Sequence, residues 1–201
     1  MSQIALPLAY PADVSDEDFI LSPANQAAIH HLDHWSLWPV MATILTGPRK
    51  SGRSLLARLF AKKARAAIID DAETKDEEAI FHAWNAAQAA RRPLLIVADD
   101  RPPAWTIGLK DLASRLAATP SVAIGAPDDA LMQALLEKAF LHRGIAVPAD
   151  LPRWIAPRVE RSYVSIHRIV DLLDQAMLAE RRRLTGPLAR RVLEPLVRSG
   201  E

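Results

Sequence analysis

The sequence predicts an α/β core built around a parallel sheet, followed by a small all-helical domain. Up to about Gly125, short apolar runs typical of buried strands alternate with amphipathic segments typical of helices. Such alternation favours a parallel sheet with helices packed on its faces. Beyond Gly125 only helical periodicity continues, and a glycine-containing loop follows the first predicted strand. We therefore expect two structural units of different class.

The core is expected to alternate strands and helices in sequence order. The predicted strands cover residues 40–45, 66–69, 94–98 and 122–124. The predicted helices cover residues 22–32, 52–65, 75–90 and 110–117. Pro23 suits a first helical turn, and the acidic start of the third helix suits the positive end of a helix dipole. The second helix separates leucines from basic side chains, as an amphipathic helix does.

The helical domain is expected to begin just after the last strand. Asp128 is a suitable N-cap for its first helix, and Gly144 is a suitable stop. Its predicted helices cover residues 128–142, 148–157, 163–182 and 187–197. The expected organisation is an extended tail at 1–13, a core at 14–125 and a helical domain at 126–201.

Composition narrows the class of protein. The 201 residues carry 25 basic and 24 acidic side chains, without the strong basic bias of a dedicated DNA-binding domain. There is no cysteine, which excludes disulfides and thiolate metal sites. No apolar run reaches the roughly 20 residues that a membrane helix needs, and no secretory signal begins the chain. We therefore expect a cytoplasmic protein that does not contact a membrane.

Residues 47–54 form the most informative motif. They read Gly-Pro-Arg-Lys-Ser-Gly-Arg-Ser and fit the phosphate-loop pattern G-x-x-x-x-G-K-[ST] at every fixed position but one. Backbone N–H groups and a helix N-terminus hold phosphates in such a loop, and the Ser54 hydroxyl would bind magnesium. The residues expected to bind nucleotide are Gly47, Lys50, Ser51, Gly52, Arg53 and Ser54. Arg53 replaces lysine with a bulkier, planar group, and a ligand-free strand–helix turn is the structural alternative.

Two acidic pairs follow predicted strands. Asp70 and Asp71 follow one apolar run, and Asp99 and Asp100 follow another. In a nucleotide site one such acid holds magnesium through water, and the next polarises the attacking water. Aspartate is also common in ordinary turns at strand ends. From these residues alone, the choice between the two pairs stays open.

Several segments together resemble one family. Residues 3–8 read Gln-Ile-Ala-Leu-Pro-Leu, like the Q-x-x-L-P-L sliding-clamp peptide at the start of Hda-type proteins. Residues 79–81 and 94–96 resemble a helix and the sensor 1 strand of that family, and residues 100–103 continue it. Residues 111–116 read Asp-Leu-Ala-Ser-Arg-Leu and match its Box VII segment. The chain thus resembles Hda-type regulators in the DnaA-like branch of the AAA+ proteins over nearly its whole length.

The resemblance implies roles for individual acids. It places Asp99 and Asp100 at sensor 1, with Asp100 among the nucleotide-binding residues, and leaves Asp70 and Asp71 as the Walker B acids. Magnesium would then be held by Ser54 and Asp70. The interval between Ser54 and the next strand has room for one helix only, so the AAA+ core is expected to be shortened to four strands.

The resemblance also implies roles for arginines. Arg115, in the Box VII segment, corresponds to an arginine finger that acts on a neighbouring molecule. The family's sensor 2 arginine falls on Val164, and Arg161, one helical turn earlier, is expected to substitute for it. From the sequence alone, an arginine near a short helix is usually a solvated or ion-paired surface residue, and only the resemblance favours the finger.

The N-terminal segment is expected to bind the DNA sliding clamp. Its contact residues are Gln3, Ile4, Leu6, Pro7 and Leu8. An extended tail can place Leu6 and Leu8 in an apolar groove while the Gln3 amide fixes the register by hydrogen bonds. Ordering such a tail costs entropy, so we expect modest affinity for a single site. An edge segment that merely covers the core is the structural alternative.

The predicted function is regulation of chromosomal replication initiation. The chain would bind the clamp and promote hydrolysis of DnaA-bound ATP, preventing re-initiation. Its own cofactor would be ADP or ATP, and the site is compatible with magnesium. Its partners would be the clamp and DnaA, with DNA contacted only indirectly, and a homo-oligomer is compatible with the sequence. Arg53 and Val164 argue against efficient ATP hydrolysis by the chain alone. The alternatives are an autonomous ATPase that remodels a partner and a nucleotide-free adaptor tethered to the clamp.

Overall fold

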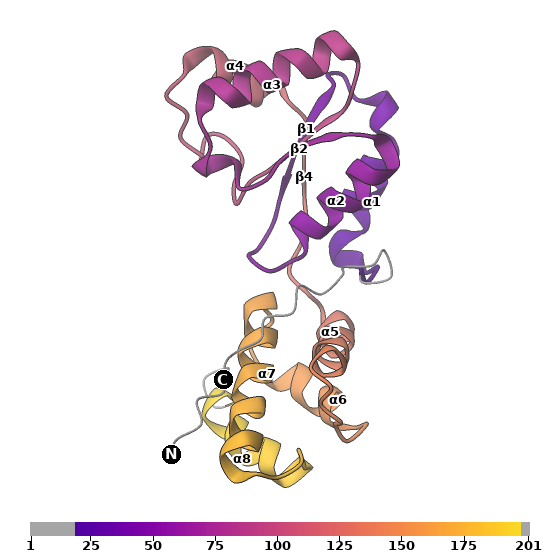
Figure 1. Ribbon diagram of the computed structural model, residues 1–201, viewed down its shortest axis with the longest axis vertical. Helices are drawn as coiled ribbons and strands as arrows, with labels where there is room; N and C mark the ends of the chain where they lie inside the picture. The colour runs from indigo at the N-terminus through magenta and orange to yellow at the C-terminus, as the bar shows by residue number, and fades with distance from the viewer. Residues whose placement is uncertain (1–18, 198–201) are drawn as a thin grey trace, which may run out of the picture.

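A parallel sheet of four strands forms the centre of the core (Figure 1). The computed structural model describes residues 19–197. The strands are β1 (Ala42–Thr46), β2 (Ala67–Ile69), β3 (Leu94–Val97) and β4 (Ser121–Ala123). Their spatial order is β2-β3-β1-β4, and every neighbouring pair is parallel. The predicted fold class, a shortened α/β core with a parallel sheet and a helical domain after it, is confirmed.

Helices cover both faces of this sheet. One face carries α1 (Pro23–Asp33) and α2 (Arg53–Ala64), and the other carries α3 (Glu77–Ala90) and α4 (Lys110–Ala118). Successive residues of a strand point to opposite faces, so Leu45 packs under α1 and α2 while Ile44 packs under α3 and α4. β3 is buried along its whole length, which explains its continuous apolar run. Two short 3₁₀ turns, η2 (Trp35–Leu37) and η3 (Ala72–Thr74), complete the core.

The remaining residues form the helical domain, which we call the lid. It consists of α5 (Asp129–His142), α6 (Leu151–Ile155), η4 (Ala156–Arg158), α7 (Tyr163–Glu180) and α8 (Gly186–Val197). The Asp128 carboxylate caps α5 by accepting from the Leu131 N–H at 2.7 Å, as its sequence position predicts. The helix expected over 148–157 is shorter and ends in η4, because Pro157 has no N–H with which to continue an α-helix. Among residues 19–197, no helix has the length and apolar character needed to cross a membrane.

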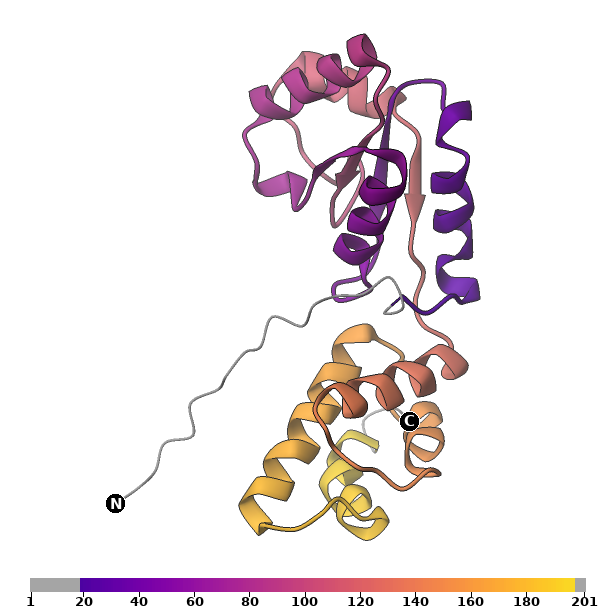
Figure 2. The same ribbon diagram turned by 45° about the vertical axis from the view of Figure 1, so that its right-hand side comes forward.

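The lid lies at the end of the core where the loop between β1 and α2 emerges (Figures 1 and 2). The Gly125 N–H donates to the Ala24 carbonyl at 2.7 Å, and the Tyr163 hydroxyl donates to the Gly125 carbonyl at 3.0 Å. Tyr163 and Leu131 of the lid are buried in the same apolar cluster as Ile124 of the core. Shared burial and these hydrogen bonds position the lid over the loop.

Candidate nucleotide site

The loop of residues 47–52 needs both of its glycines. Gly47 has φ +148°, and a Cβ atom there would lie 2.8 Å from the Ile124 carbonyl oxygen. Gly52 has φ +89° and is the N-cap of α2. Both φ values lie where L-residues are strained, and Gly47 also lies too close to its neighbour for any side chain. The two fixed glycines of the motif are thus explained by backbone geometry.

The start of α2 presents unsatisfied polar groups to the loop. No side chain caps this helix, so the first-turn N–H groups have no partner within the helix. Ser51 is only 8 % exposed, and its hydroxyl has no hydrogen-bond partner among the residues that the structure describes. A buried hydroxyl without a partner is costly, and a phosphate oxygen would satisfy it. Helix dipole and orphaned donors together fit an anion here.

Lys50 occupies a strained position in the loop. Its φ is +66°, in the left-handed region that costs a residue with a side chain about 1–2 kcal/mol. The side chain is exposed and lines two hollows, one toward the lid and one toward β2. Strained conformations of this kind gather at functional sites, because neighbouring structure holds them in place.

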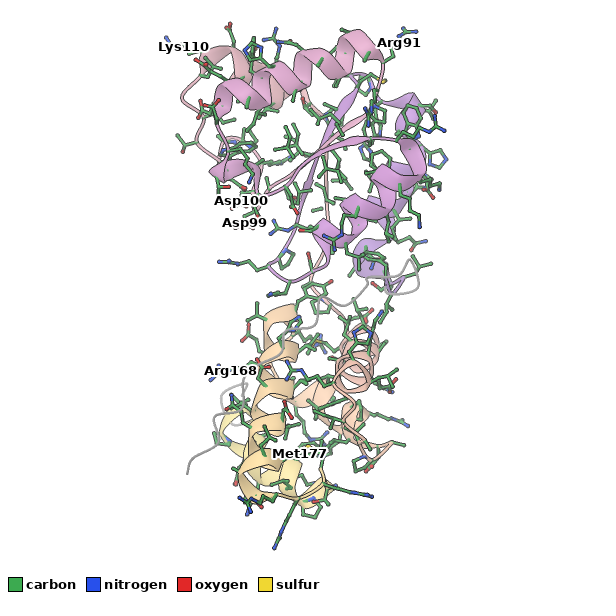
Figure 3. All side chains as sticks on the ribbon, in the orientation of Figure 1. Arg91, Asp99, Asp100, Lys110, Arg168 and Met177 are labelled. Carbon is green, nitrogen blue, oxygen red and sulfur yellow. The ribbon has the colours of Figure 1, made fainter. Side chains whose placement is uncertain are left out.

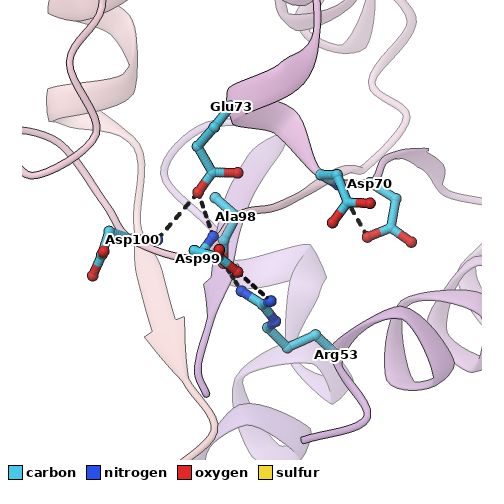
Figure 4. Close-up of polar contacts among 7 residues, drawn as sticks. Arg53, Asp70, Glu73, Ala98, Asp99 and Asp100 are labelled. Atoms are coloured by element: carbon cyan, nitrogen blue, oxygen red, sulfur yellow. Dashed lines mark hydrogen bonds and ion pairs between the residues drawn. The ribbon is translucent and has the colours of Figure 1, made fainter. Parts of the chain in front are cut away.

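Arg53, at the position of the motif lysine, is tied to the end of β3 (Figure 4). Its Nη1 donates to the Ala98 carbonyl and its Nη2 to the Asp99 carboxylate at 2.5 Å. The Arg53 side chain is 11 % exposed, whereas that of Asp99 is 58 % exposed. β3 lies beside β1, so parallel pairing brings the two groups together at one edge of the sheet. The guanidinium is thus neutralised and held by a planar fork that lysine cannot reproduce.

Of the two acids after β3, Asp99 is the one that meets the loop. The Glu73 carboxylate of η3 accepts from the N–H of Asp99 and from the N–H of Asp100, the latter at 3.2 Å. In Figure 4 the Asp100 carboxylate points away from Arg53. Asp100, the acid chosen from the sequence, therefore does not pair with Arg53, and Glu73 was not identified from the sequence at all.

The expected magnesium ligands are only partly brought together. Asp71, Ser54 and Arg58 line one hollow beside the loop, whereas Asp70 does not line it. An Asp70 oxygen accepts from the Asp71 N–H at 3.1 Å instead. Residues 19–197 contain no cluster of three or more acidic or histidine side chains able to hold a metal. Hard oxygen ligands are what magnesium prefers, so a metal here would rely on Ser54, a neighbouring acid and a bound phosphate.

A cavity of about 290 Å³ lies between the loop and the lid. Its walls are mostly apolar and include Phe19 and Ile20 of the core and Leu135 and Ile166 of the lid. Asn25, 4 % exposed, holds the Phe19–Ile20 wall: its Nδ2 donates to the Ile20 carbonyl at 2.8 Å. An apolar slot beside a phosphate loop fits a nucleotide base, because such sites are concave and largely apolar with a few polar groups.

Three titratable lid residues that no sequence motif singled out also line this cavity: Lys138, His142 and His167. Lys138 and His142 are four residues apart on α5 and therefore share a helix face. Partial burial first, and then the positive charges of Lys50 and Arg143, lower the pKa of His167, while Asp171 raises it. The spacing of Lys138 and His142 was visible in the sequence, but the proximity of α7 to the loop was not.

Arg161, the expected substitute for a sensor 2 arginine, is ion-paired with Asp129 instead. Its guanidinium forms a two-point ion pair with Asp129, with Nε–Oδ1 at 2.8 Å and Nη2–Oδ2 at 3.0 Å. It does not line the cavity, and Val164 is half exposed. Neither residue presents a cation to the loop in this structure.

Arg115 lies far from the loop. Its guanidinium stacks on the rings of Phe81 and Trp84, at 4.3 and 5.3 Å from their centroids. It lines neither hollow beside the loop, and α4 covers the sheet face opposite α2. Figure 3 shows Lys110, the first residue of α4, at the far end of the core from Asp99. Arg115 is therefore placed away from the chain's own candidate nucleotide site.

The expected clamp-binding residues lie outside the part of the chain that the structure describes. They are Gln3, Ile4, Leu6, Pro7 and Leu8.

Comparisons with known proteins give a sequence match in the lid and structural matches over most of the chain. Residues 128–193 match the family model of the Hda lid domain. Domain III of the Thermotoga maritima replication initiation protein DnaA matches with a TM-score of 0.63 and 14% identity, over 90% of this chain and 95% of that chain. AMPPCP-bound DnaA from Aquifex aeolicus matches with 0.59 and 15%, over 83% and 67%.

The Thermotoga maritima RuvB Holliday junction branch migration motor matches with a TM-score of 0.58 and 14% identity, over 86% of this chain and 67% of that chain. At such identities the solved structures establish the fold, and the lid match shows that residues 128–193 are similar to Hda lid domains. The core thus has the fold seen in DnaA and RuvB, and the helical domain resembles the Hda lid.

Proposed function

We propose that this chain, an Hda-type protein with a DnaA-like AAA+ fold, regulates replication initiation by docking on the sliding clamp and promoting hydrolysis of ATP bound to DnaA. The clamp would recruit it through Gln3, Ile4, Leu6, Pro7 and Leu8. Nucleotide in the loop would set the angle between core and lid. Arg115 would then reach the γ-phosphate of ATP held by DnaA.

The separation of Arg115 from the chain's own loop is the observation that carries this proposal. A finger that served its own nucleotide would have to lie at the loop, whereas Arg115 lies on α4 and rests on Phe81 and Trp84. A cation–π contact of this kind stabilises the arginine by about 0.5–2 kcal/mol. This is little enough for the guanidinium to leave the rings and bind a phosphate instead. An arginine supplied in trans accelerates such hydrolysis by about 10³–10⁵.

The site itself favours binding over turnover. The apolar cavity and the Ser51 hydroxyl fit ADP or ATP, and Ser54 with a neighbouring acid would hold magnesium. Arg53, however, is paired with Asp99, and Arg161 is paired with Asp129. Cations committed in this way do not neutralise charge at a terminal phosphate. The Arg53–Asp99 and Arg161–Asp129 ion pairs favour a regulator with a resident nucleotide over an autonomous ATPase. The cavity beside the loop favours it over a nucleotide-free adaptor.

The test is hydrolysis of DnaA-bound ATP with DNA-loaded clamp and the full chain. We expect Arg115→Ala to lower the stimulated rate at least about 10³-fold while clamp binding persists. Arg158→Ala is the matched control, because Arg158 lies 5.1 Å from the Trp154 ring centroid in a similar stack in the lid. Full stimulation by Arg115→Ala would refute the finger.

Clamp docking has its own measurement. A Gln3→Ala, Leu6→Ala double variant should lose clamp binding while its melting temperature shows no change. If the double variant bound the clamp as well as the unmodified chain, the docking step would be wrong.

A further inference from the structure

His167 is the lid side chain best placed to meet a nucleotide phosphate. It lines the cavity together with Lys50, Ser51 and Gly52 of the loop. It lies one helical turn after Val164, and residues three apart share a helix face. Arg161, the lid cation expected from the sequence, is ion-paired with Asp129 and does not line the cavity.

We infer that His167 contacts the phosphates of the bound nucleotide from the lid side, opposite Lys50 of the loop, and so takes the place of the missing sensor 2 arginine. The inference rests on the proposed nucleotide site. It assigns the lid's contact to a residue whose charge depends on pH.

Charges around His167 explain why a phosphate belongs there. It faces Lys50 from the loop, Arg143 after α5 and Asp171 one turn along α7, with Lys138 and His142 across the cavity. Asp171 is already ion-paired with Arg143. The surroundings are therefore mainly basic, and an anion between loop and lid would relieve their mutual repulsion.

The same charges set the sign of a pH effect. Without ligand, partial burial and Lys50 lower the pKa of His167 below its ordinary 6.5. A phosphate beside the ring favours the protonated form and raises that pKa, so binding takes up a proton. Affinity should fall as pH rises between the pKa of the free protein and that of the complex, and should level off outside this window.

The experiment is calorimetric titration of the full chain with ADP from about pH 6 to about pH 8. Near pH 6 we expect His167→Gln to weaken ADP binding about tenfold, the loss of one charge-assisted hydrogen bond. The variant should also lose most of the pH dependence, and what remains would come from ADP's own ionisation. His82→Gln, an exposed histidine on α3, is the control and should bind ADP normally.

A rescue variant separates phosphate contact from a merely structural role. Val164 is half exposed, so Val164→Arg is tolerable there. Combined with His167→Gln, it should restore ADP affinity and leave only the pH dependence of ADP's own ionisation, because arginine stays charged.

The outcomes distinguish this inference from the one on which it rests. Unchanged ADP affinity and unchanged pH dependence in His167→Gln would overturn the role of His167 and leave the nucleotide site standing. No binding of ADP by the unmodified chain would overturn the nucleotide site and this inference with it.

Discussion

Replacing Arg53 by lysine restores the phosphate-loop motif, yet we expect it to destabilise the protein. The Arg53 fork holds two acceptors at once, the Ala98 carbonyl and the Asp99 carboxylate. A lysine ammonium is a point charge and can reach only one of them. Loss of the bond to the buried Ala98 carbonyl should cost about 1–3 kcal/mol, since a buried acceptor is left unsatisfied. The Asp99 part contributes at most about 1 kcal/mol, because that carboxylate is 58 % exposed and screened by water.

Urea unfolding of Arg53→Lys, Asp99→Asn and the double variant measures these terms. We expect Arg53→Lys to cost more than Asp99→Asn, with a coupling energy of about 0.5–1 kcal/mol between the two sites. ADP should stabilise Arg53→Lys more than the unmodified chain, because the released cation is free to meet phosphates. If Arg53→Lys unfolded at the same urea concentration and gained nothing from ADP, the fork would have no structural role and the reasoning would be refuted.

Two further predictions concern stability. The Phe140 ring is fully buried in the lid core, so Phe140→Ala should lower the free energy of unfolding by about 3–5 kcal/mol in urea. Leu141 is 76 % exposed, so Leu141→Ala should change it by less than about 0.5 kcal/mol. Similar costs for both variants would contradict the burial assignment. The free energy of unfolding should fall as pH drops below 6.5, because burial and then His30 lower the pKa of His31, which the unfolded chain protonates first. His31→Gln should reduce this dependence in urea titrations at about pH 7.5 and about pH 5.5 and leave the part that comes from the lowered pKa of His167, and an unaltered slope would exclude His31 as a source.

Local patterns predicted the elements well, because each depends on neighbours in the chain. Glycines at 47 and 52 predicted the loop, and the structure gives both a positive φ. Asp128 predicted the start of α5, and its carboxylate accepts from the Leu131 N–H. The apolar run of residues 94–98 predicted a strand, and the structure buries all of β3. Caps, turns and periodicity act over a few residues, so a single sequence is enough to read them.

The partners of charged side chains were not predictable in the same way. Arg53 and Asp99 meet only because β3 lies beside β1, which a linear sequence does not state. The backbone just after β3 directs the Asp99 carboxylate toward Arg53 and the Asp100 carboxylate away from it, and only the structure shows this. His167 was not singled out from the sequence, because its place in the cavity depends on how α7 packs on the core.

The sequence by itself determined the strand and helix order, the glycine-bounded loop at residues 47–52 and the resemblance to Hda-type proteins, because these reside in local patterns. Only the tertiary structure decided that the motif arginine is tied to Asp99, that Arg161 is paired with Asp129, and that Arg115 lies apart from its own loop. The physical reason is the distance along the chain over which each kind of interaction acts. Backbone preferences are set within a few residues of the chain, whereas electrostatic and packing partners are chosen by a sheet order and a lid position that join segments distant in sequence.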